Sequence, residues 1–508
     1  MQNQHSRALS AVTSNTGKMV IIFFSAIGLR ALPELFSGAY PVGFDTLQGY
    51  VPAILALPDD SPMKLFGWAY SPLAIYLLGF AYMVARIDLF LLIKIAGPIF
   101  YGVLSISFYY LLSNGLKWSS KKSFLVTLIL ILQPAVLRMG WDQFREELGL
   151  TFLFVLLGIT KCDVISSIKK KQDAFLVLAL SLLIVFSHQL VAILLFVVVL
   201  WQVLIHENKR EKSFVTTIFA IVPSILIFAW QINGQFLNPM YNLHFAPVQM
   251  YSGSNIFAFT NYFLSDPRFI GGNYLTILSH VGSLSFFSFM PLIPFAIRGF
   301  SKDKICFPML IWLIPASLSI LVFPWFALQM YWWWILLLPI PLTIYLGKFL
   351  DGVQVFENKK CGSRKKIFGI TLFMIGLLAV AYASSAVKVV YFDAETYMPS
   401  GMVESSIPFT DIPNVKSAIT WANKNIPPNS TLIVQECIQG FSYSELRPDV
   451  QIRVVSSLLT LNQAVNLIPT ELCTKYSIWY KQDVDYQTFP GVKVIEFGAI
   501  GIFQIGDY

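Results

Sequence analysis

Charged residues in two short segments could carry chemistry in an otherwise strongly apolar chain. Asp45 follows a Gly-containing turn, Tyr40-Pro-Val-Gly-Phe, and the local sequence offers it no cationic partner. The second segment, Arg138 to Glu147, holds two cations and three acids. Carboxylates can accept protons from hydroxyl groups, and Arg side chains bind anions. The pattern is consistent with one site, with Asp45 facing the second segment across an outer cavity.

Each of these groups also has a structural interpretation. Acids near a helix start interact with its positive end, so Asp142 and Glu146 could form an ordinary solvated helix terminus. Helical spacing puts those two on one face, and Arg138 on the face of Asp142 if the turn continues. Asp45 could support its own turn. His188, in Phe-Ser-His-Gln-Leu, could be a hydrogen-bonded turn residue or a functional one.

The composition predicts that lipid surrounds the elements that position these residues. Apolar residues make up 56% of the 508 and charged residues only 13%, whereas soluble domains carry about 25% charged residues. So few charged residues cannot give the folded chain a surface that is compatible with water. Lipid must therefore cover the remaining apolar surface. We predict eleven membrane helices, at 19–36, 89–112, 123–137, 147–160, 174–187, 189–205, 213–230, 282–297, 305–323, 327–346 and 367–387.

The distribution of Lys and Arg predicts the orientation. Six segments together contain 21 Lys and Arg residues but only 7 acids, whereas the remaining chain contains 15 and 21. Basic loops stay cytoplasmic, so the N-terminus is expected inside the cell membrane and the C-terminus outside. The net charge of +8 is therefore a topology signal, and no nucleic-acid partner is predicted. The basic segments are 1–18, 113–122, 161–173, 206–212, 298–304 and 347–366.

The positions of Lys and Arg also decide whether two ambiguous apolar stretches cross the membrane. Run 69–85 is predicted to lie on the outer surface, because a crossing there would put the Lys-rich loop 113–122 outside. Stretch 174–205 is predicted to cross twice, with a turn near Ser187–His188, because Lys residues flank both of its ends. The outer loops are then 37–88, 138–146 and 231–281.

Few ionisable residues fall inside the predicted spans. Arg30 and Glu34 are four residues apart, and we expect them to pair along one helix face, since isolated charges are costly there. Lys94 lies six residues into its span, and its long side chain is expected to extend back toward the surface.

The tail is predicted to form a small α/β domain outside the membrane, residues 388–508, after a membrane domain of residues 1–387. A helix is expected from a cap at Asp411 to about Asn425, and a second over 461–468. Cys437 and Cys473 could form a disulfide or remain buried thiols. Strands are expected at 431–435, 451–455, 476–480, 492–497 and 500–505.

This organisation resembles the GT-C superfamily of membrane glycosyltransferases. The resemblance lies in a long first outer loop with the early Asp45, in Tyr70-Ser-Pro-Leu73 at the start of a juxtamembrane helix, and in an Asp-bearing loop after the third span. The tail outside also fits. Protein mannosyltransferases, aminoarabinose transferases and the catalytic subunit of oligosaccharyltransferase are of this type. The family often has Pro-Pro-Leu and two acids in the first loop, where this chain has Ser71-Pro72-Leu73 and Asp45 alone.

The resemblance implies a transferase that moves a sugar from a polyprenyl-phosphate-linked donor to a lipid, glycan or protein acceptor at the outer membrane face. Asp45 would be the general base that takes the proton of the acceptor hydroxyl. Arg145, Arg138 or Lys64 would stabilise the departing phosphate.

The remaining charged groups would support that reaction. Asp142 would act with Asp45 in catalysis, and Asp142 or Glu146 would orient the cation or hold a metal. Whether a divalent metal ion is the cofactor stays open at this point, because the sequence alone demonstrates none. His188 would have a supporting role. Besides the sugar donor, the expected partners are membrane lipids.

Two other classes fit the composition. A polymerase or ligase of surface polysaccharides would also use a large outer loop such as 231–281, with His244 and Arg268. A transporter or assembly protein is the other class. A transporter would be expected to place ionisable residues in the middle of several spans, and many transporters are built from repeats, which this sequence lacks.

Overall fold

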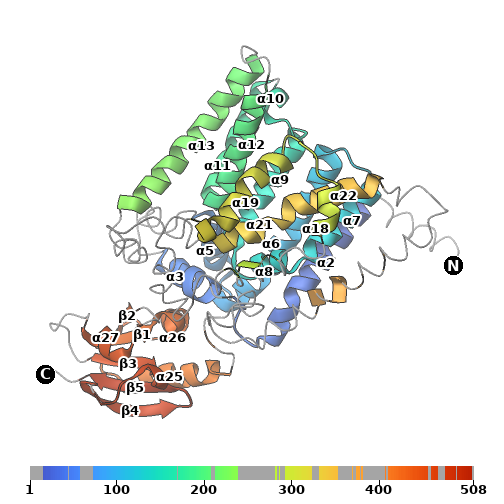
Figure 1. Cartoon of the computed structure of the whole chain (residues 1–508). Helices are drawn as coiled ribbons and strands as arrows, with labels where there is room; N and C mark the ends of the chain where they lie inside the picture. Colours follow the sequence, from blue (N-terminus) through green and yellow to red (C-terminus); the bar gives the residue numbers. More distant parts are fainter. Residues whose placement is uncertain are drawn as a thin grey trace.

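A computed structural model of the chain shows a large helical part and a small C-terminal sheet (Figure 1). The structure describes residues 15–57, 72–206, 212–237, 292–322, 331–352, 410–455, 459–466 and 475–505, except for Phe44, Lys169 and Thr488. It also describes residue 407 and scattered positions within 278–285 and 369–380.

The membrane part is a helical assembly around one large apolar core, to which most of its helices contribute buried residues. Helix α6 continues without interruption into a π-helical turn, η2, at Leu111–Gly115, and the two together have 27 residues. The helices are α2 (Asn15–Phe36), α6 (Leu89–Tyr110), α7 (Ser120–Ile131), α8 (Pro134–Asp142), α9 (Phe144–Ile159), α11 (Lys171–Ser187), α12 (Gln189–Ile205), α13 (Lys212–Leu237), α18 (Ile293–Arg298), α19 (Cys306–Val322), α21 (Tyr331–Leu337) and α22 (Pro339–Gly352).

Length and composition identify part of the predicted set of spans. Among the described residues three helices are long and apolar enough to cross a membrane, and the bent pair α7–α8 would add a fourth. The predicted total of eleven is not confirmed by this criterion. One reason is length: α12 has 17 residues, or about 26 Å at the helical rise, whereas an apolar core of about 30 Å needs about 20. The three helices lie at Leu89–Gly115, Ser213–Gln231 and Trp333–Asp351.

The chain reverses direction at His188, as the charges predicted. His188 has an extended conformation between α11 and α12. The end of α12 returns to the segment that precedes α11, because Gln202 accepts a hydrogen bond from the Val164 amide (2.8 Å) and donates one to the Cys162 carbonyl (3.1 Å). The two helices therefore form an antiparallel pair, and the single long helix considered as the alternative is wrong.

The predicted loop 138–146 is mostly helical, which corrects the sequence analysis. Helix α8 continues to Asp142, and α9 begins at Phe144. Only Gln143 separates them, with φ −104° and ψ 54°, outside the helical region. This break puts Asp142 and Glu146 on different helices, so the predicted shared helical face does not form.

The segment 37–88, for which we keep the predicted name of first outer loop, contains short helices close to the membrane part. They are η1 (Thr46–Tyr50), α3 (Val51–Ala56) and α5 (Leu73–Ala85). Helix α5 has 13 residues, or about 20 Å, which is short for a crossing and is consistent with the predicted surface position of 69–85.

The basic segments that were predicted to be cytoplasmic contact one another at one end of the helices. We call this the basic end. Its contacts, which join five of the six segments, are Lys18 Nζ to Ser120 Oγ (2.7 Å), Lys122 with Asp351 (2.5 Å), Lys348 with Asp303 (2.7 Å) and Lys304 with Asp163.

The tail folds into a five-stranded sheet with helices on it, as predicted. The strand order is β2-β1-β3-β5-β4, in which β1 pairs in parallel with β2 and β3, and β5 pairs antiparallel with β3 and β4. One helix, α26, was not predicted. The elements are α25 (Ile412–Asn425), β1 (Thr431–Gln435), α26 (Gln439–Glu445), β2 (Gln451–Val455), α27 (Leu461–Asn466), β3 (Lys475–Tyr480), β4 (Gly491–Phe497) and β5 (Ile500–Ile505).

Asp411 precedes α25, but the predicted capping bond is not made. Its side chain instead accepts a hydrogen bond from the Tyr480 hydroxyl at 3.1 Å. Pro413 at the second helical position has no amide hydrogen, which removes one of the donors that a cap would use. The predicted boundary at 388 and Cys473 lie outside the described residues, so the disulfide remains a prediction.

Helix α26 docks the tail onto the first outer loop, close to α3 (Figure 1). Tyr40 donates a hydrogen bond to Glu445 at 2.9 Å, and its ring packs edge-on against Phe441 at 4.9 Å. A Cβ on Gly440 would lie 1.9 Å from the carbonyl oxygen of Leu47, so the two backbones touch. Burial and the Glu445 hydrogen bond raise the pKa of Tyr40 above its usual range, which keeps the donor protonated.

Candidate functional site

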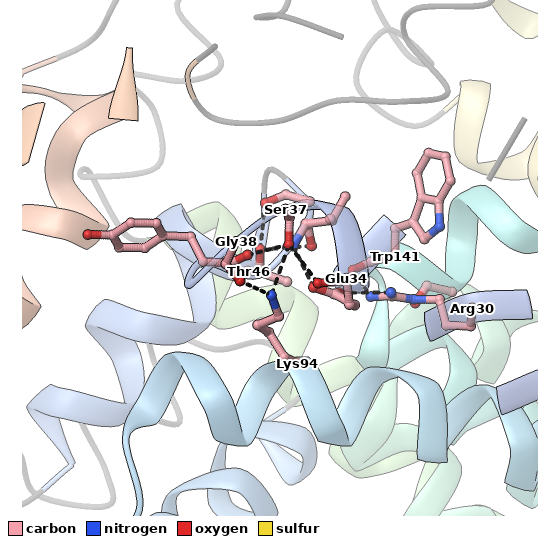
Figure 2. Close-up of polar contacts among 11 residues, drawn as sticks. Arg30, Glu34, Ser37, Gly38, Thr46, Lys94 and Trp141 are labelled. Atoms are coloured by element: carbon pink, nitrogen blue, oxygen red, sulfur yellow. Dashed lines mark hydrogen bonds and ion pairs between the residues drawn. The ribbon is translucent and has the colours of Figure 1, made fainter. Parts of the chain in front are cut away.

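The end of α2 is held by a buried ion pair, as the four-residue spacing predicted (Figure 2). Arg30 and Glu34 are 2.8 Å apart, and their side chains are 0% and 5% exposed. The second oxygen of Glu34 accepts a hydrogen bond from the Val42 amide at 3.1 Å. The pair therefore fixes the turn that leads to Asp45.

Arg30 also joins this turn to α8. Its Nε donates to the Gly140 carbonyl at 2.5 Å, and its Nη2 donates to the Trp141 carbonyl at 3.0 Å. Because the guanidinium has donors to the carboxylate and to two carbonyls, its burial is compensated. The first outer loop and the α8–α9 segment are thus bound together at the same end of the helices, which we call the site end.

Lys94 extends from α6 toward the first outer loop, as expected for a charge inside a span. Its Nζ donates to Ser37 Oγ at 3.1 Å and to the Gly38 carbonyl (Figure 2). Gly38 has a φ of +71°, a left-handed conformation that favours glycine. The lysine therefore stabilises a tight turn a few residues before Asp45.

Asp45 lies directly before η1 and is half-buried. Its side chain makes no capping bond to η1. Thr46 supports the backbone here by donating to the carbonyls of Val42 (3.2 Å) and Gly43 (2.5 Å). Both Asp45 and Glu146 act electrostatically on Arg145, so the carboxylate in the first loop is close to a cation of the second charged segment.

Arg145 is positioned by an aromatic contact between the two segments. The Arg145 amide donates to the Tyr50 hydroxyl at 3.3 Å, and the guanidinium carbon lies 6.0 Å from the centre of the Tyr50 ring. Tyr50 also stacks on Phe144, with ring centres 5.1 Å apart. Tyr50 was not singled out in the sequence, because an aromatic in a loop carries no local signal of such a contact.

Glu146 and His188 form a second contact at the site end. The Oε1 of Glu146 lies 3.0 Å from the Nε2 of His188, and both side chains are buried. The ring of Trp333 packs 5.6 Å from that of His188. The contact between Glu146 and His188 links the start of α9, where Arg145 lies, to the turn between α11 and α12.

The structure describes the remaining predicted site residues only in part. Arg138 is buried within α8. The backbone of Asp142 ends α8, and its side chain lies outside the described part, as do Lys64 and most of loop 231–281. Within the described residues, no group of three or more His, Cys, Asp or Glu side chains could hold a metal ion.

No known protein family and no curated protein matches the sequence. Solved structures do match. Arabinofuranosyltransferase AftD from mycobacteria, in a mutant form, aligns with a TM-score of 0.52 at 11% identity, over 96% of this chain and 41% of AftD. This chain therefore spans about two fifths of the length of AftD.

Two further structures align less closely. A second AftD structure has a TM-score of 0.49 at 10% identity, over 96% of this chain and 40% of that one. ArnT from Cupriavidus metallidurans, bound to undecaprenyl phosphate, has a TM-score of 0.48 at 13% identity, over 97% of this chain and 98% of ArnT. With its helical membrane part and small C-terminal sheet, the chain shares the GT-C fold of the arabinofuranosyltransferase AftD.

Proposed function

We propose that this protein is a membrane glycosyltransferase that moves a sugar from a polyprenyl-phosphate-linked donor to an acceptor hydroxyl at the outer membrane face. The observation that carries the proposal is the contact of Tyr50 with Arg145, which joins the first outer loop, in which Asp45 lies, to the second charged segment. A carboxylate next to a cation supplies the two groups that this transfer needs.

Asp45 is the proposed general base. It takes the proton of the acceptor hydroxyl while the acceptor oxygen bonds to the anomeric carbon of the sugar. The bond from that carbon to the phosphate oxygen breaks at the same time, through an oxocarbenium-like state. The polyprenyl phosphate leaves with the bonding electrons and gains negative charge.

Arg145 is the proposed ligand of that phosphate, because a guanidinium binds phosphate through two parallel hydrogen bonds. Arg138 and Lys64 are secondary candidates for the same role. Glu146 orients Arg145, on which it acts electrostatically, and His188 supports Glu146 from 3.0 Å. Asp142 is proposed to act in catalysis together with Asp45, as the sequence analysis suggested. We infer no step that needs a metal.

The test is transfer by the purified full chain, using polyprenyl-phosphate sugars as donors. The variant Asp45→Asn removes the base, and transfer should fall about 10²- to 10⁴-fold, the usual contribution of general base catalysis. Binding of undecaprenyl phosphate should be largely retained, since Arg145 is intact.

Asp88→Asn is the matched control. Asp88 is another carboxylate near the site end, where it caps α6 by accepting a hydrogen bond from the Leu91 amide at 2.9 Å. Asn caps helices about as well as Asp, so both stability and transfer should be unchanged. Equal transfer by wild type and Asp45→Asn would remove Asp45 from the mechanism.

The outer location needs a separate test. A reporter enzyme fused after residue 388 should be active only outside the cytoplasm, because the distribution of Lys and Arg puts the tail outside. A cytoplasmic reporter signal would reverse the orientation and move the proposed reaction to the inner face.

A further inference from the structure

Four polar side chains are buried together around the start of α9. Gln143 and Glu146 come from α9 and the residue before it, and they are 2% and 3% exposed. His188 and Gln189 come from the turn into α12, and they are 4% and 9% exposed. The contact between Glu146 and His188 at 3.0 Å joins the two pairs. We call these four residues the polar cluster.

Each member of the polar cluster has a buried polar atom without a hydrogen-bond partner among the described residues. Buried polar atoms are nearly always bonded, because an unmade bond in the interior has a large free-energy cost. Several such atoms in one place therefore indicate a site that another molecule completes. The atoms are Gln143 Nε2, Glu146 Oε2, His188 Nδ1 and Gln189 Nε2.

A second glutamine on the same helix shows what a purely structural residue looks like. Gln202 is buried at the basic end of α12, and both ends of its amide are bonded, to the Val164 amide and the Cys162 carbonyl. Burial on α12 alone thus does not leave a glutamine unsatisfied. The incomplete bonding of Gln189 therefore does not follow from its helix or from its burial.

The chemistry of the cluster identifies the class of ligand. The amide nitrogens donate hydrogen bonds, whereas the Glu146 carboxylate accepts them. A phosphate offers only acceptors and would be repelled by Glu146 and the buried Glu147. A sugar hydroxyl both donates and accepts, so a ring bearing several hydroxyls can satisfy a mixed set of groups. The ring of Trp333 adds an apolar wall beside His188.

We propose that the polar cluster binds the hydroxyl groups of the donor sugar. The inference rests on the proposed function and adds a sugar subsite to it. Arg145 lies in the chain between Gln143 and Glu146, so a phosphate held by Arg145 puts its attached sugar next to the cluster. The polyprenyl chain and the phosphate bind elsewhere, which makes sugar recognition separable from lipid recognition.

The experiment measures binding rather than transfer. The full chain is titrated with undecaprenyl phosphate and with undecaprenyl phosphate that carries arabinose, mannose or glucose. Wild type should bind at least one sugar-bearing lipid more tightly than the plain lipid. In Gln189→Leu this preference should fall about three- to tenfold, the effect of losing one hydrogen bond. Affinity for plain undecaprenyl phosphate should be unchanged.

Gln202→Leu is the matched control, because it makes the same substitution on the same helix. It removes the hydrogen bonds of Gln202 with Val164, Cys162 and Lys304, so it should lower the melting temperature and leave the preference for sugar intact. Gln189→Leu should show the opposite pattern. Gln143→Leu provides a second, independent variant of the cluster, with the same expected loss of preference.

Two results would overturn the inference. One is a wild type that binds plain undecaprenyl phosphate as tightly as every sugar-bearing form. The other is a preference that survives in both Gln189→Leu and Gln143→Leu. Both results leave the lipid-binding part of the proposed function standing. A wild type that binds none of these lipids would overturn the proposed function together with the subsite.

Discussion

The two ends of the helical assembly are built differently. At the basic end three ion pairs, Lys122–Asp351, Lys348–Asp303 and Lys304–Asp163, join the described segments, and the buried Gln202 is fully bonded. At the site end the Arg30–Glu34 pair is equally complete, but the polar cluster a short distance along the chain keeps buried atoms without described partners. At the basic end buried atoms without a described partner occur singly, as at Ser123 Oγ and Ser213 Oγ, whereas at the site end four neighbouring residues have such atoms.

This difference separates stability from function. Natural proteins tend to depart from complete internal bonding where they bind or react. The substitutions that follow test the distinction, because the structural pairs should affect folding and the site residues should affect transfer. They are ordered from the largest expected effect to the smallest.

Arg30→Met should destabilise the protein most. It leaves Glu34 buried with one hydrogen bond, from the Val42 amide, and such an unpaired charge costs about 3–5 kcal/mol. Thermal unfolding in detergent measures the loss. The double variant Arg30→Met/Glu34→Leu should recover part of it, because no charge then remains buried. A single variant as stable as wild type would show that the pair does not hold the loop.

Arg145→Met should leave folding nearly intact and reduce transfer about 10²- to 10³-fold, the range for losing one group that stabilises a transition-state charge. Donor titration and transfer rates measure the effect. Affinity for undecaprenyl phosphate should fall as well, in contrast to Asp45→Asn. If affinity and rate both stay at wild-type values, the phosphate binds to another cation.

Gly440→Leu should detach α26 from the first outer loop, because its Cβ would lie 1.9 Å from a backbone oxygen of Leu47. Overpacking of this kind costs about 1–3 kcal/mol. Hydrogen exchange of residues 46–56 should increase, and transfer should fall because the loop after Asp45 loses its support. Ser444→Ala on the same helix is the control and should change neither. Unchanged exchange in Gly440→Leu would contradict the docking contact.

Asp351→Asn at the basic end should have the smallest effect. Its partner Lys122 is only 4% exposed, but the Asp351 side chain is 60% exposed, and ion pairs with such an exposed member contribute about 1 kcal/mol or less. Lys122 also keeps its position over the Trp118 ring, 3.4 Å from the ring centre. Transfer should be unchanged, and a large loss of transfer would remove the distinction between the two ends.

Local patterns in the sequence predicted most individual elements. The turn at His188 followed from lysines on both sides of an apolar stretch, and the strands of the tail followed from short apolar runs between turn residues. These features depend on neighbours in the chain, which is why they could be predicted. Helix α26 was missed because Gln439–Glu445 is short and polar and contains a glycine.

The arrangement of the site depends on contacts between distant segments. The break at Gln143 has no Pro or Gly directly next to it, although it decides where Glu146 lies. The packing of Tyr50 on Phe144 joins residues that are nearly a hundred positions apart. The sequence could therefore nominate Asp45, Arg145, Glu146 and His188, but it could not show that Gln143 and Gln189 lie among them.

The docking of α26 also affects how the protein is made. Tyr40 and Glu445 are 405 residues apart, so the first outer loop lacks this partner until most of the chain has been translated. At about 5–20 residues per second, the interval is roughly 20–80 s. A nascent chain in the membrane thus exposes Asp45 on an unsupported loop throughout that time. Activity should begin only after the ribosome has released the segment that contains α26.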